Sequence, residues 1–370
     1  MFSLNQSARY AALFLLLGFL LVGVWRPMET SEPDDSLDGS WVSVLGEADR
    51  LGLVFGENAI FTGANLSPIY SKYFNKELFP IVLIIVLFCA LVSASVIVYL
   101  LGNFRWTTII IMVASLPFWG LSRDALFLSL PLLAGLTYLV APPGRFTPGA
   151  TAFLSALSGI LVLAKFSVFP FAVFISILID IAAVSRRHYM FSTPILFLAL
   201  YIIYGFLNSF DPAAFLNYLK YSLDTAKNFG DAMSDHPDVL KLELSEIGLF
   251  IFASLLAFVS VIVTERTLVR NKRSDLQTAA LVLLIVLSYL YILLKTGFVR
   301  HDFHTRTAWT GLIVMGTIYI AARGGYRTPG CMEVCLGIAM LTGVVAFHLA
   351  PSSITPDFRV SHSIENQLKA

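Results

Sequence analysis

The sequence predicts an all-α protein, a polytopic bundle of about 11 transmembrane helices. Of the 370 residues, 57% are hydrophobic and only 13% are charged, and the mean hydropathy of +0.78 is far above that of a soluble globular protein. Several apolar runs exceed the ~18 residues that indicate a membrane-spanning helix. We therefore expect a single transmembrane domain over residues 1–350, followed by a short extracytoplasmic tail over 351–370.

The spans are placed where apolar runs are separated by polar or turn-forming residues. The expected ranges are 10–25, 79–101, 106–121, 124–141, 150–165, 168–185, 190–209, 247–264, 278–295, 307–322 and 331–349. The stretch 151–185 is too long for one span, and Lys165, Ser167 and Pro170 divide it into a tight hairpin. The first 25 residues resemble a signal peptide, but no small-residue cleavage pattern follows, so we expect a retained anchor.

Basic residues near the span ends predict that the N-terminus lies in the cytoplasm. In that orientation the cytoplasmic side carries 11 basic and four acidic residues, whereas the other side carries 14 basic and 20 acidic residues. Short connections rich in Lys and Arg are preferentially cytoplasmic. The long loops 26–78 and 210–246 and the segment 295–306 would then share the extracytoplasmic face.

Each long loop is predicted to carry a short helix at the membrane surface. In the first loop, apolar residues recur near helical spacing over 42–53. In the second loop, aromatic and basic residues over 218–227 indicate an amphipathic helix, which we expect to end in a turn at Gly230.

The segment 295–306, KTGFVRHDFHTR, is the first candidate for a binding site, because charged groups beside hydrocarbon are costly and usually mark a site or a water-filled cavity. Its strongly basic character favours an anion such as phosphate. Four basic side chains are the expected phosphate ligands: Lys295, Arg300, His301 and His304. Asp302 would orient one of them.

The same segment contains residue types that bind metals. His301 and His304 are three residues apart with Asp302 between them, and such a set can bind a divalent cation. Arg300 and Arg306 crowd the set with positive charge, which opposes a cation. We therefore assign no metal ligand and no certain cofactor, and a divalent metal ion stays open as an alternative.

The first loop offers a candidate base. Asp38 precedes Gly39-Ser40-Trp41, and a carboxylate held at the membrane surface can take a proton from a sugar hydroxyl. The plainer interpretation of the acids in this loop is a solvated surface. Trp41 would set the depth of the loop at the level of the lipid headgroups.

Two short connections supply further candidates. Arg123 and Asp124 follow the third span, and Arg123 either binds phosphate through its planar fork or reaches along the membrane surface. Lys165 is more informative, because an isolated lysine between two apolar spans has few other uses. We assign Arg123 and Lys165 to phosphate binding and Asp124 to a supporting role.

The sequence also excludes several classes of protein. It has no Walker A loop, no Gly-rich dinucleotide turn, no zinc-protease motif and no G-x-S-x-G motif. A nucleotide-driven pump is therefore excluded, and a nucleotide-sugar enzyme with a soluble catalytic domain is excluded because the chain has no room for such a domain. We expect no nucleic-acid partner.

A series of local strings follows almost the whole chain in order. They are LDGSW (37–41), GLVFGENAIFTGANLSPIY (52–70), SRDALFLSLPLL (122–133), AKFS (164–167), YLKYSLDTAKNFGDAMS (218–234) and KTGFVRHDFH (295–304). These strings resemble those of a group of bacterial GT-C-like membrane proteins. The order of spans and long external loops is similar to that of the GT-C superfamily of integral-membrane glycosyltransferases.

This resemblance implies a multi-pass protein of the bacterial inner (plasma) membrane that takes a polyprenyl-phosphate sugar as donor and transfers it on the extracytoplasmic face. It also implies a base from the first loop, a place that Asp38 holds. The leading hypothesis is an inverting glycosyltransferase acting on a cell-envelope glycan or lipid among membrane lipids. The alternatives are a non-catalytic glycolipid transporter or flippase component, and a polysaccharide polymerase or ligase.

Overall fold

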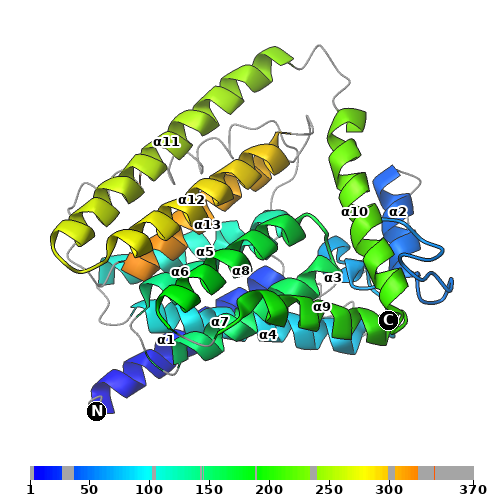
Figure 1. The fold of residues 1–370 in the computed structure, drawn as a ribbon, viewed down its shortest axis with the longest axis horizontal. Coiled ribbons are helices and arrows are strands. Elements are labelled where there is room, and N and C mark those ends of the chain that lie inside the picture. The colour runs from blue at the N-terminus through cyan, green and yellow to red at the C-terminus, as the bar shows by residue number, and fades with distance from the viewer. Residues whose placement is uncertain are drawn as a thin grey trace.

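The computed structural model describes residues 4–26, 37–101, 106–141, 144, 146–187, 190–233, 240–298, 305–323 and 337. Within these ranges the side chains of residues 4–6, 37–40, 106–107, 229–233 and 240–245 are outside the description. The described chain is all-helical (Figure 1). Its helices are α1 (Leu4–Trp25), α2 (Leu37–Gly46), α3 (Ser67–Ser71), α4 (Phe79–Leu101), α5 (Trp106–Trp119), α6 (Arg123–Val140), α7 (Phe146–Val162), α8 (Val168–Ser185), α9 (Ser192–Leu207), α10 (Pro212–Met233), α11 (Leu240–Arg270), α12 (Leu276–Gly297) and α13 (Thr305–Arg323).

Six of the described helices are long and apolar enough to cross a membrane, namely α1, α4, α6, α8, α11 and α12. Helices α9 and α10 meet the same criterion only together, and they are bent by 109° where they join. The chain is therefore a multi-pass helical membrane protein. Ten of the 11 expected ranges coincide with helices, and the eleventh, 331–349, lies almost wholly outside the described residues. The number of spans stays a prediction.

Helices α6 and α13 form the centre of the bundle. Nearly every residue of both is buried, and α6 contacts α4, α7, α8, α12 and α13. The outer helices instead expose large apolar side chains such as Phe19, Phe88 and Phe252. Exposed apolar surface of this kind matches a hydrocarbon environment, in which helices satisfy their own backbone hydrogen bonds.

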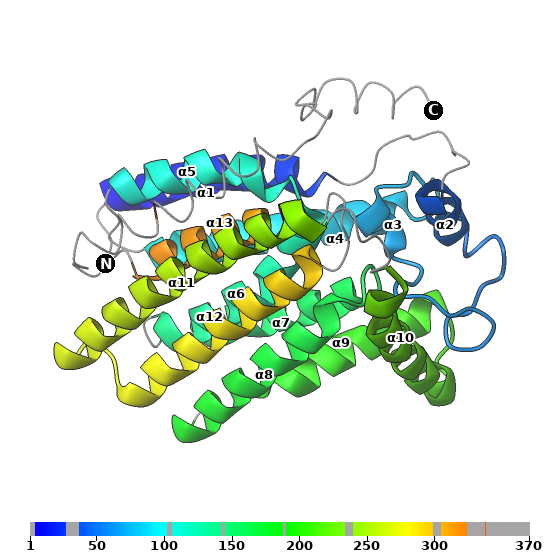
Figure 2. The same ribbon diagram turned by 90° about the horizontal axis from the view of Figure 1, so that it is seen from above.

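Helices α2, α3 and α10 gather at one end of the bundle, which we call the loop end (Figures 1 and 2). The N-terminus of α1 lies toward the opposite end (Figure 2). In the orientation predicted from the basic residues, the loop end is the extracytoplasmic one.

The structure confirms the hairpin predicted between two adjacent apolar runs. Helix α7 ends at Val162 and α8 begins at Val168, so Lys165 and Ser167 lie in the connection. Pro170 falls in the first turn of α8, where its missing N–H group leaves no helical hydrogen bond unmade.

Two predictions about the loop helices were wrong. The surface helix expected over 42–53 is α2, which begins at Leu37 and ends at Gly46. A Cβ atom at Gly46 would lie 2.1 Å from the Tyr73 ring, and Gly52 has a φ of +62°, so the segment after α2 turns instead of continuing as a helix. The turn expected at Gly230 does not form, and α10 continues to Met233. The helix tolerates this glycine because a glycine inside a helix lowers stability by only about 1 kcal/mol.

Candidate functional site

Three segments that are distant in sequence meet at the loop end around Tyr70. The hydroxyl of Tyr70 in α3 donates a hydrogen bond to Asp124 Oδ2 at 2.9 Å. The ammonium group of Lys165 lies over the same ring, 4.2 Å from its centroid. The Ser167 hydroxyl donates to Asp124 Oδ1 at 3.3 Å. We call these four residues, Tyr70, Asp124, Lys165 and Ser167, the Tyr70 cluster.

The cluster is held by backbone pairing between the first loop and the α7–α8 hairpin. The Ala64 N–H group donates to the Leu163 carbonyl at 2.8 Å, and the Phe166 N–H group donates to the Thr62 carbonyl at 2.6 Å. Backbone groups in a loop need such partners when water is excluded. The pairing brings α3, which follows the paired loop segment, to the hairpin that carries Lys165.

Asp124 is positioned by the start of α6. Ser122 is the N-cap residue, and its hydroxyl oxygen accepts from the Ala125 N–H group at 3.3 Å. Arg123 and Asp124 therefore belong to the first turn of α6. The sequence had placed them in the connection before this helix. A carboxylate in the first turn is favoured by the positive end of the helix dipole, and Asp124 is buried.

The guanidinium group of Arg123 is directed toward the end of α1. It donates to the backbone carbonyls of Trp25 and of Arg26, the latter at 2.6 Å. Carbonyls at the end of a helix lack intrahelical partners, and Arg123 supplies donors to those at the end of α1. Its assignment to phosphate binding stays a prediction.

An apolar groove of about 310 Å³ lies beside the first loop. Trp41 of α2 stacks on Phe61 there, with 5.5 Å between the ring centroids. The Phe61 carbonyl accepts from the Ser222 hydroxyl of α10 at 3.0 Å. Because Phe61 precedes Thr62, which pairs with the hairpin, the groove is joined to the Tyr70 cluster through the backbone.

Helix α2 is also linked to the segment after α3. The Tyr73 hydroxyl donates to Glu47 Oε1 at 3.2 Å, directly after the end of α2. Burial raises the pKa of Tyr73, and the neighbouring Glu47 carboxylate raises it further. The phenol therefore stays protonated at neutral pH and remains a donor.

The first and second loops dock on each other at Gly56. The φ angle of Gly56 is +94°, and a Cβ atom there would lie 2.1 Å from the Ala214 carbonyl oxygen of α10. Only glycine combines that backbone conformation with such a close approach. Asn65 adds a second link, because its side-chain amide donates to the Leu207 carbonyl at 3.2 Å.

The structure brings together some of the predicted site residues. Lys165 and Asp124 share the Tyr70 cluster, and Trp41 stacks on Phe61, whose neighbour Thr62 pairs with Phe166 next to Lys165. Lys295 is exposed in the last turn of α12, and Gly297 packs against Ala308 of α13. The first turn of α13 reaches the cluster region, because the Thr307 hydroxyl lies 2.8 Å from the Ser122 hydroxyl.

Other predicted residues lie outside the described part of the chain. Asp38 is on α2, one turn before Trp41, but its side chain is outside the description. Arg300, His301, Asp302 and His304 lie outside the described residues altogether. The residues that are described contain no group of three or more potential metal ligands, and the metal alternative over 301–304 is untested.

Two members of the cluster, Tyr70 and Ser167, were missed as site residues. Both end quoted strings, GLVFGENAIFTGANLSPIY and AKFS, but neither carries a charge that would single it out. The signal that could have found Ser167 is its place two residues after an isolated lysine. No pattern in the sequence places Tyr70 beside Lys165, because the contact depends on how the first loop folds.

Comparison of the chain with protein-family models, with curated proteins and with solved structures found no match in any of the three. The resemblance to GT-C glycosyltransferases thus rests on the sequence strings and on the order of spans and loops.

Proposed function

We propose that this protein is an inverting glycosyltransferase of the GT-C type, which moves a sugar from a polyprenyl-phosphate donor to a cell-envelope glycan or lipid. The observation that carries the proposal is the Tyr70 cluster, in which Lys165 is held at the loop end beside the first loop. A lipid-linked phosphate donor lies at the same boundary between lipid and water, where a fixed cation can meet it.

The proposed reaction uses residues from three segments. The acceptor hydroxyl attacks the anomeric carbon while Asp38 takes its proton. The bond between that carbon and the phosphate oxygen breaks, and polyprenyl phosphate leaves with the bonding electrons. Lys165, Arg300 and His301 would stabilise the negative charge that develops on the leaving group.

The surroundings of Lys165 suit this role. The Tyr70 ring attracts the ammonium group through its π-face without neutralising its charge. Asp124 accepts from the Tyr70 and Ser167 hydroxyls, and among the described residues no carboxylate forms an ion pair with Lys165. The charge of Lys165 is therefore left for an anionic substrate.

The apolar groove at Trp41 and Phe61 suits the rest of the donor. A polyprenyl-phosphate sugar has a long hydrocarbon chain, a phosphate and a sugar ring. The open apolar groove can hold the hydrocarbon chain, and its stacked aromatic rings provide a flat surface for the sugar. Lys165, which the pairing of Phe166 with Thr62 joins to the groove, can bind the phosphate.

The test measures donor binding and sugar transfer with purified protein in nanodiscs, using a set of radiolabelled polyprenyl-phosphate sugars. We expect wild-type protein to bind at least one donor and to release polyprenyl phosphate. Lys165→Gln should weaken donor binding about tenfold or more, since one charge-assisted contact is lost. The control is Lys76→Gln, which removes an exposed lysine before α4. Equal binding by both variants would contradict the role of Lys165.

A glycolipid transporter is the second candidate, and the bend of 109° between α9 and α10 favours it. Transporters often build substrate sites at interrupted helices. A wild-type protein that binds the donor but never transfers its sugar would support this alternative. A protein that transfers normally without the Asp38 carboxylate would instead favour a polymerase or ligase.

A further inference from the structure

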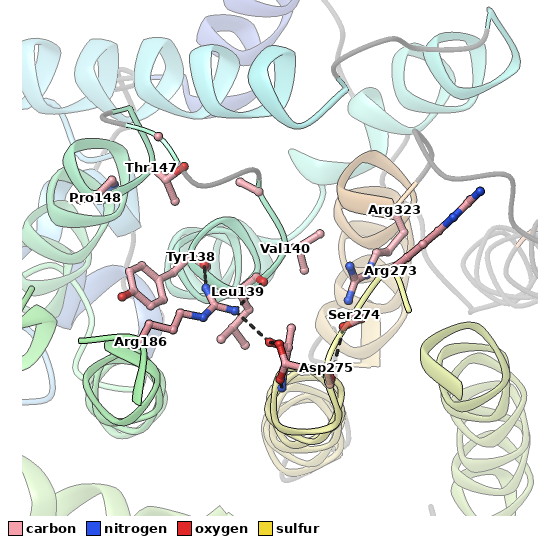
Figure 3. Close-up of a pocket in the computed structure, with 13 residues that line it drawn as sticks. Tyr138, Leu139, Val140, Thr147, Pro148, Arg186, Arg273, Ser274, Asp275 and Arg323 are labelled. Carbon is pink, nitrogen blue, oxygen red and sulfur yellow. Dashed lines mark hydrogen bonds between the residues drawn. The ribbon is translucent and has the colours of Figure 1, made fainter. Parts of the chain in front are cut away.

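Figure 3 shows a second cavity, which lies at the end of α6, whereas the Tyr70 cluster lies at the start of α6; the two are therefore at opposite ends of the bundle. Its volume is about 410 Å³, and its walls come from the end of α6, the starts of α7 and α12, and the ends of α8 and α13. Unlike the groove at Trp41, it is lined by guanidinium and hydroxyl groups. The relevant side chains are Arg186, Arg273, Thr147, Ser274, Asp275 and Thr278.

Arg186 holds several of these helix ends together. Its guanidinium group donates to the carbonyls of Tyr138 at 2.9 Å and Leu139 at 3.2 Å, and to the Thr278 hydroxyl oxygen at 2.9 Å. Figure 3 shows this group reaching from α8 toward α12. All three acceptors are neutral, and they occupy three of the five N–H groups of an arginine side chain. The positive charge of Arg186 therefore persists within the cavity.

The remaining charges of the lining leave a positive excess. Arg323 is neutralised by Glu265, to which it donates two hydrogen bonds of 2.8 and 2.6 Å. Asp275 offsets one of the other two guanidinium groups, and its oxygens accept from the N–H and hydroxyl groups of Thr278. One positive charge remains, carried jointly by Arg186 and the exposed Arg273.

Helix α7 adds to this positive character. Thr147 and Pro148, in its first turn, line the cavity, and of the two only Thr147 has a backbone N–H group. The first N–H groups of a helix have no intrahelical acceptors, and the start of a 17-residue helix attracts anions. The cavity thus combines a helix start with two arginine side chains, which together suit a tetrahedral anion.

We propose that this cavity binds a phosphate group at the end of the bundle opposite the proposed transfer site. A phosphate can accept charge-assisted hydrogen bonds from the two N–H groups of Arg186 that Tyr138, Leu139 and Thr278 leave open, and from the exposed Arg273. The cavity opens where membrane helices end, which is the level of lipid headgroups, and basic pockets between such helices bind anionic lipids. The phosphate group belongs either to an anionic phospholipid or to a soluble phosphate compound.

The first experiment is a labelling assay on detergent-purified protein with Cys331 and Cys335 replaced by serine. Ser274→Cys places a thiol in the cavity wall, and Asn271→Cys places one on the exposed surface nearby. We expect phosphatidylglycerol to slow maleimide labelling at 274 about tenfold, but not at 271, while phosphatidylcholine slows neither. Protection by inorganic phosphate at millimolar concentration would assign the site to a soluble phosphate compound instead of a lipid. Failure of both probes to protect position 274 would overturn the proposal.

The second experiment tests the arginines in the same assay. Arg273→Gln and Arg186→Lys should each weaken protection about tenfold, because glutamine removes a charge and lysine has three N–H donors where arginine has five. Arg270→Gln removes an exposed arginine at the end of α11, three residues before Arg273 and outside the cavity lining, and it should leave protection unchanged. If Arg186→Lys prevents folding, Arg273→Gln still decides the matter, since its side chain is exposed. Equal protection in the Arg270 and Arg273 variants would contradict the proposal, whatever the protein does to sugars.

Discussion

The ammonium group of Lys165 lies 4.2 Å from the centroid of the Tyr70 ring, and the hydroxyl of that ring donates to Asp124. One phenol therefore orients a cation with its face and an anion with its edge. The lysine and the carboxylate contact different parts of the ring, so we propose that the lysine keeps its attraction for a substrate phosphate while the carboxylate accepts from the phenol.

Tyr70→Phe and Tyr70→Leu should separate these two functions. Tyr70→Phe keeps the ring face but removes the donor to Asp124, so we expect a loss of about 1.5–3 kcal/mol of stability and nearly unchanged donor binding. Tyr70→Leu should in addition weaken donor binding several-fold, because a cation–π contact contributes about 0.5–2 kcal/mol. Thermal unfolding and donor titration of the two variants provide the measurement. Identical donor affinities would show that the ring face does not position Lys165.

Asp38→Asn and Arg300→Lys should affect different steps. Asp38→Asn should preserve donor binding and reduce transfer about 10²–10⁴-fold, because only proton removal is lost. Arg300→Lys should weaken donor binding although it preserves the charge, since lysine has no planar fork. Binding isotherms and single-turnover transfer rates distinguish the two outcomes.

The control for the base is Asp49→Asn, which changes an exposed acid of the same loop and should leave transfer unchanged. Full turnover by Asp38→Asn would remove the base assignment and leave the phosphate ligands to be tested alone.

The predicted orientation places Asp49 outside the cell and Asn271 in the cytoplasm. Both side chains are exposed, so cysteine at either position should react once a reagent reaches it. With Cys331 and Cys335 replaced by serine and Cys89 buried, an impermeant maleimide should label intact cells with Asp49→Cys and not with Asn271→Cys. The reverse pattern would place the Tyr70 cluster in the cytoplasm and end the proposal of extracytoplasmic transfer.

Breaking the ion pair between Arg323 of α13 and Glu265 of α11 should lower the free energy of unfolding more than breaking an exposed ion pair. The side chains are 2% and 1% exposed, and the Tyr319 hydroxyl also donates to Glu265 at 2.9 Å. Arg323→Met leaves a buried carboxylate without its partner, which costs about 3–5 kcal/mol. Adding Glu265→Gln should recover much of this loss, because the amide is neutral and its oxygen still accepts from Tyr319.

Arg50→Ala is the matched control for this prediction. It breaks an ion pair of similar length, 3.0 Å to Glu47, but the arginine is 71% exposed. Exposed pairs contribute about 0–1 kcal/mol, so the unfolding midpoint should barely change. A smaller effect for Arg323→Met than for Arg50→Ala would contradict the assigned importance of burial.

The stability of α12 should fall in acid because Asp275 is its N-cap. Partial burial raises the pKa of Asp275, but hydrogen bonds from Thr278 and the charge of Arg186 outweigh it, so the pKa lies below its ordinary value. The charged form is therefore the one that the fold favours. Its contribution is complete above the unfolded-state pKa of about 3.8 and is lost as the pH falls through the lower folded-state value.

Thermal unfolding of wild-type protein and Asp275→Ala from pH 7 to pH 2.5 measures this contribution. We expect a difference of about 0.5–2 kcal/mol at neutral pH, which shrinks below pH ~4. A difference that grows toward low pH would mean that the carboxyl group stabilises the fold in its neutral form.

The helices were predictable where a long apolar run ends at polar residues. The run 79–101 is α4 without any change of boundary, and 168–185 is α8, because Lys165 and Ser167 interrupt an otherwise continuous apolar stretch. The boundaries of α2 were not predictable, since its end depends on the Tyr73 ring packing against Gly46. Periodicity describes one segment at a time and carries no information about such neighbours.

The candidate site was predictable only in its charged members. Lys165 and Asp124 stand out because charge is rare beside apolar spans, and the structure places both in one cluster. Tyr70 does not stand out in a chain with 14 tyrosines. Its position follows from the backbone pairing of Ala64 with Leu163, which joins segments that no local pattern connects.

The docking of the first loop on the second sets an order for biosynthesis. The Phe55 carbonyl accepts from the Tyr204 hydroxyl, 149 residues later in the chain, and Gly56 packs on α10, which comes later still. At ordinary translation rates of about 5–20 residues per second, the first loop waits about 7–30 s for these partners. During that interval the aromatic side chains of the first loop lack the partners that α9 and α10 later provide, and they stay exposed to solvent. In the predicted orientation, a chain interrupted before α9 would therefore present an unfinished extracytoplasmic surface of the kind that proteases recognise.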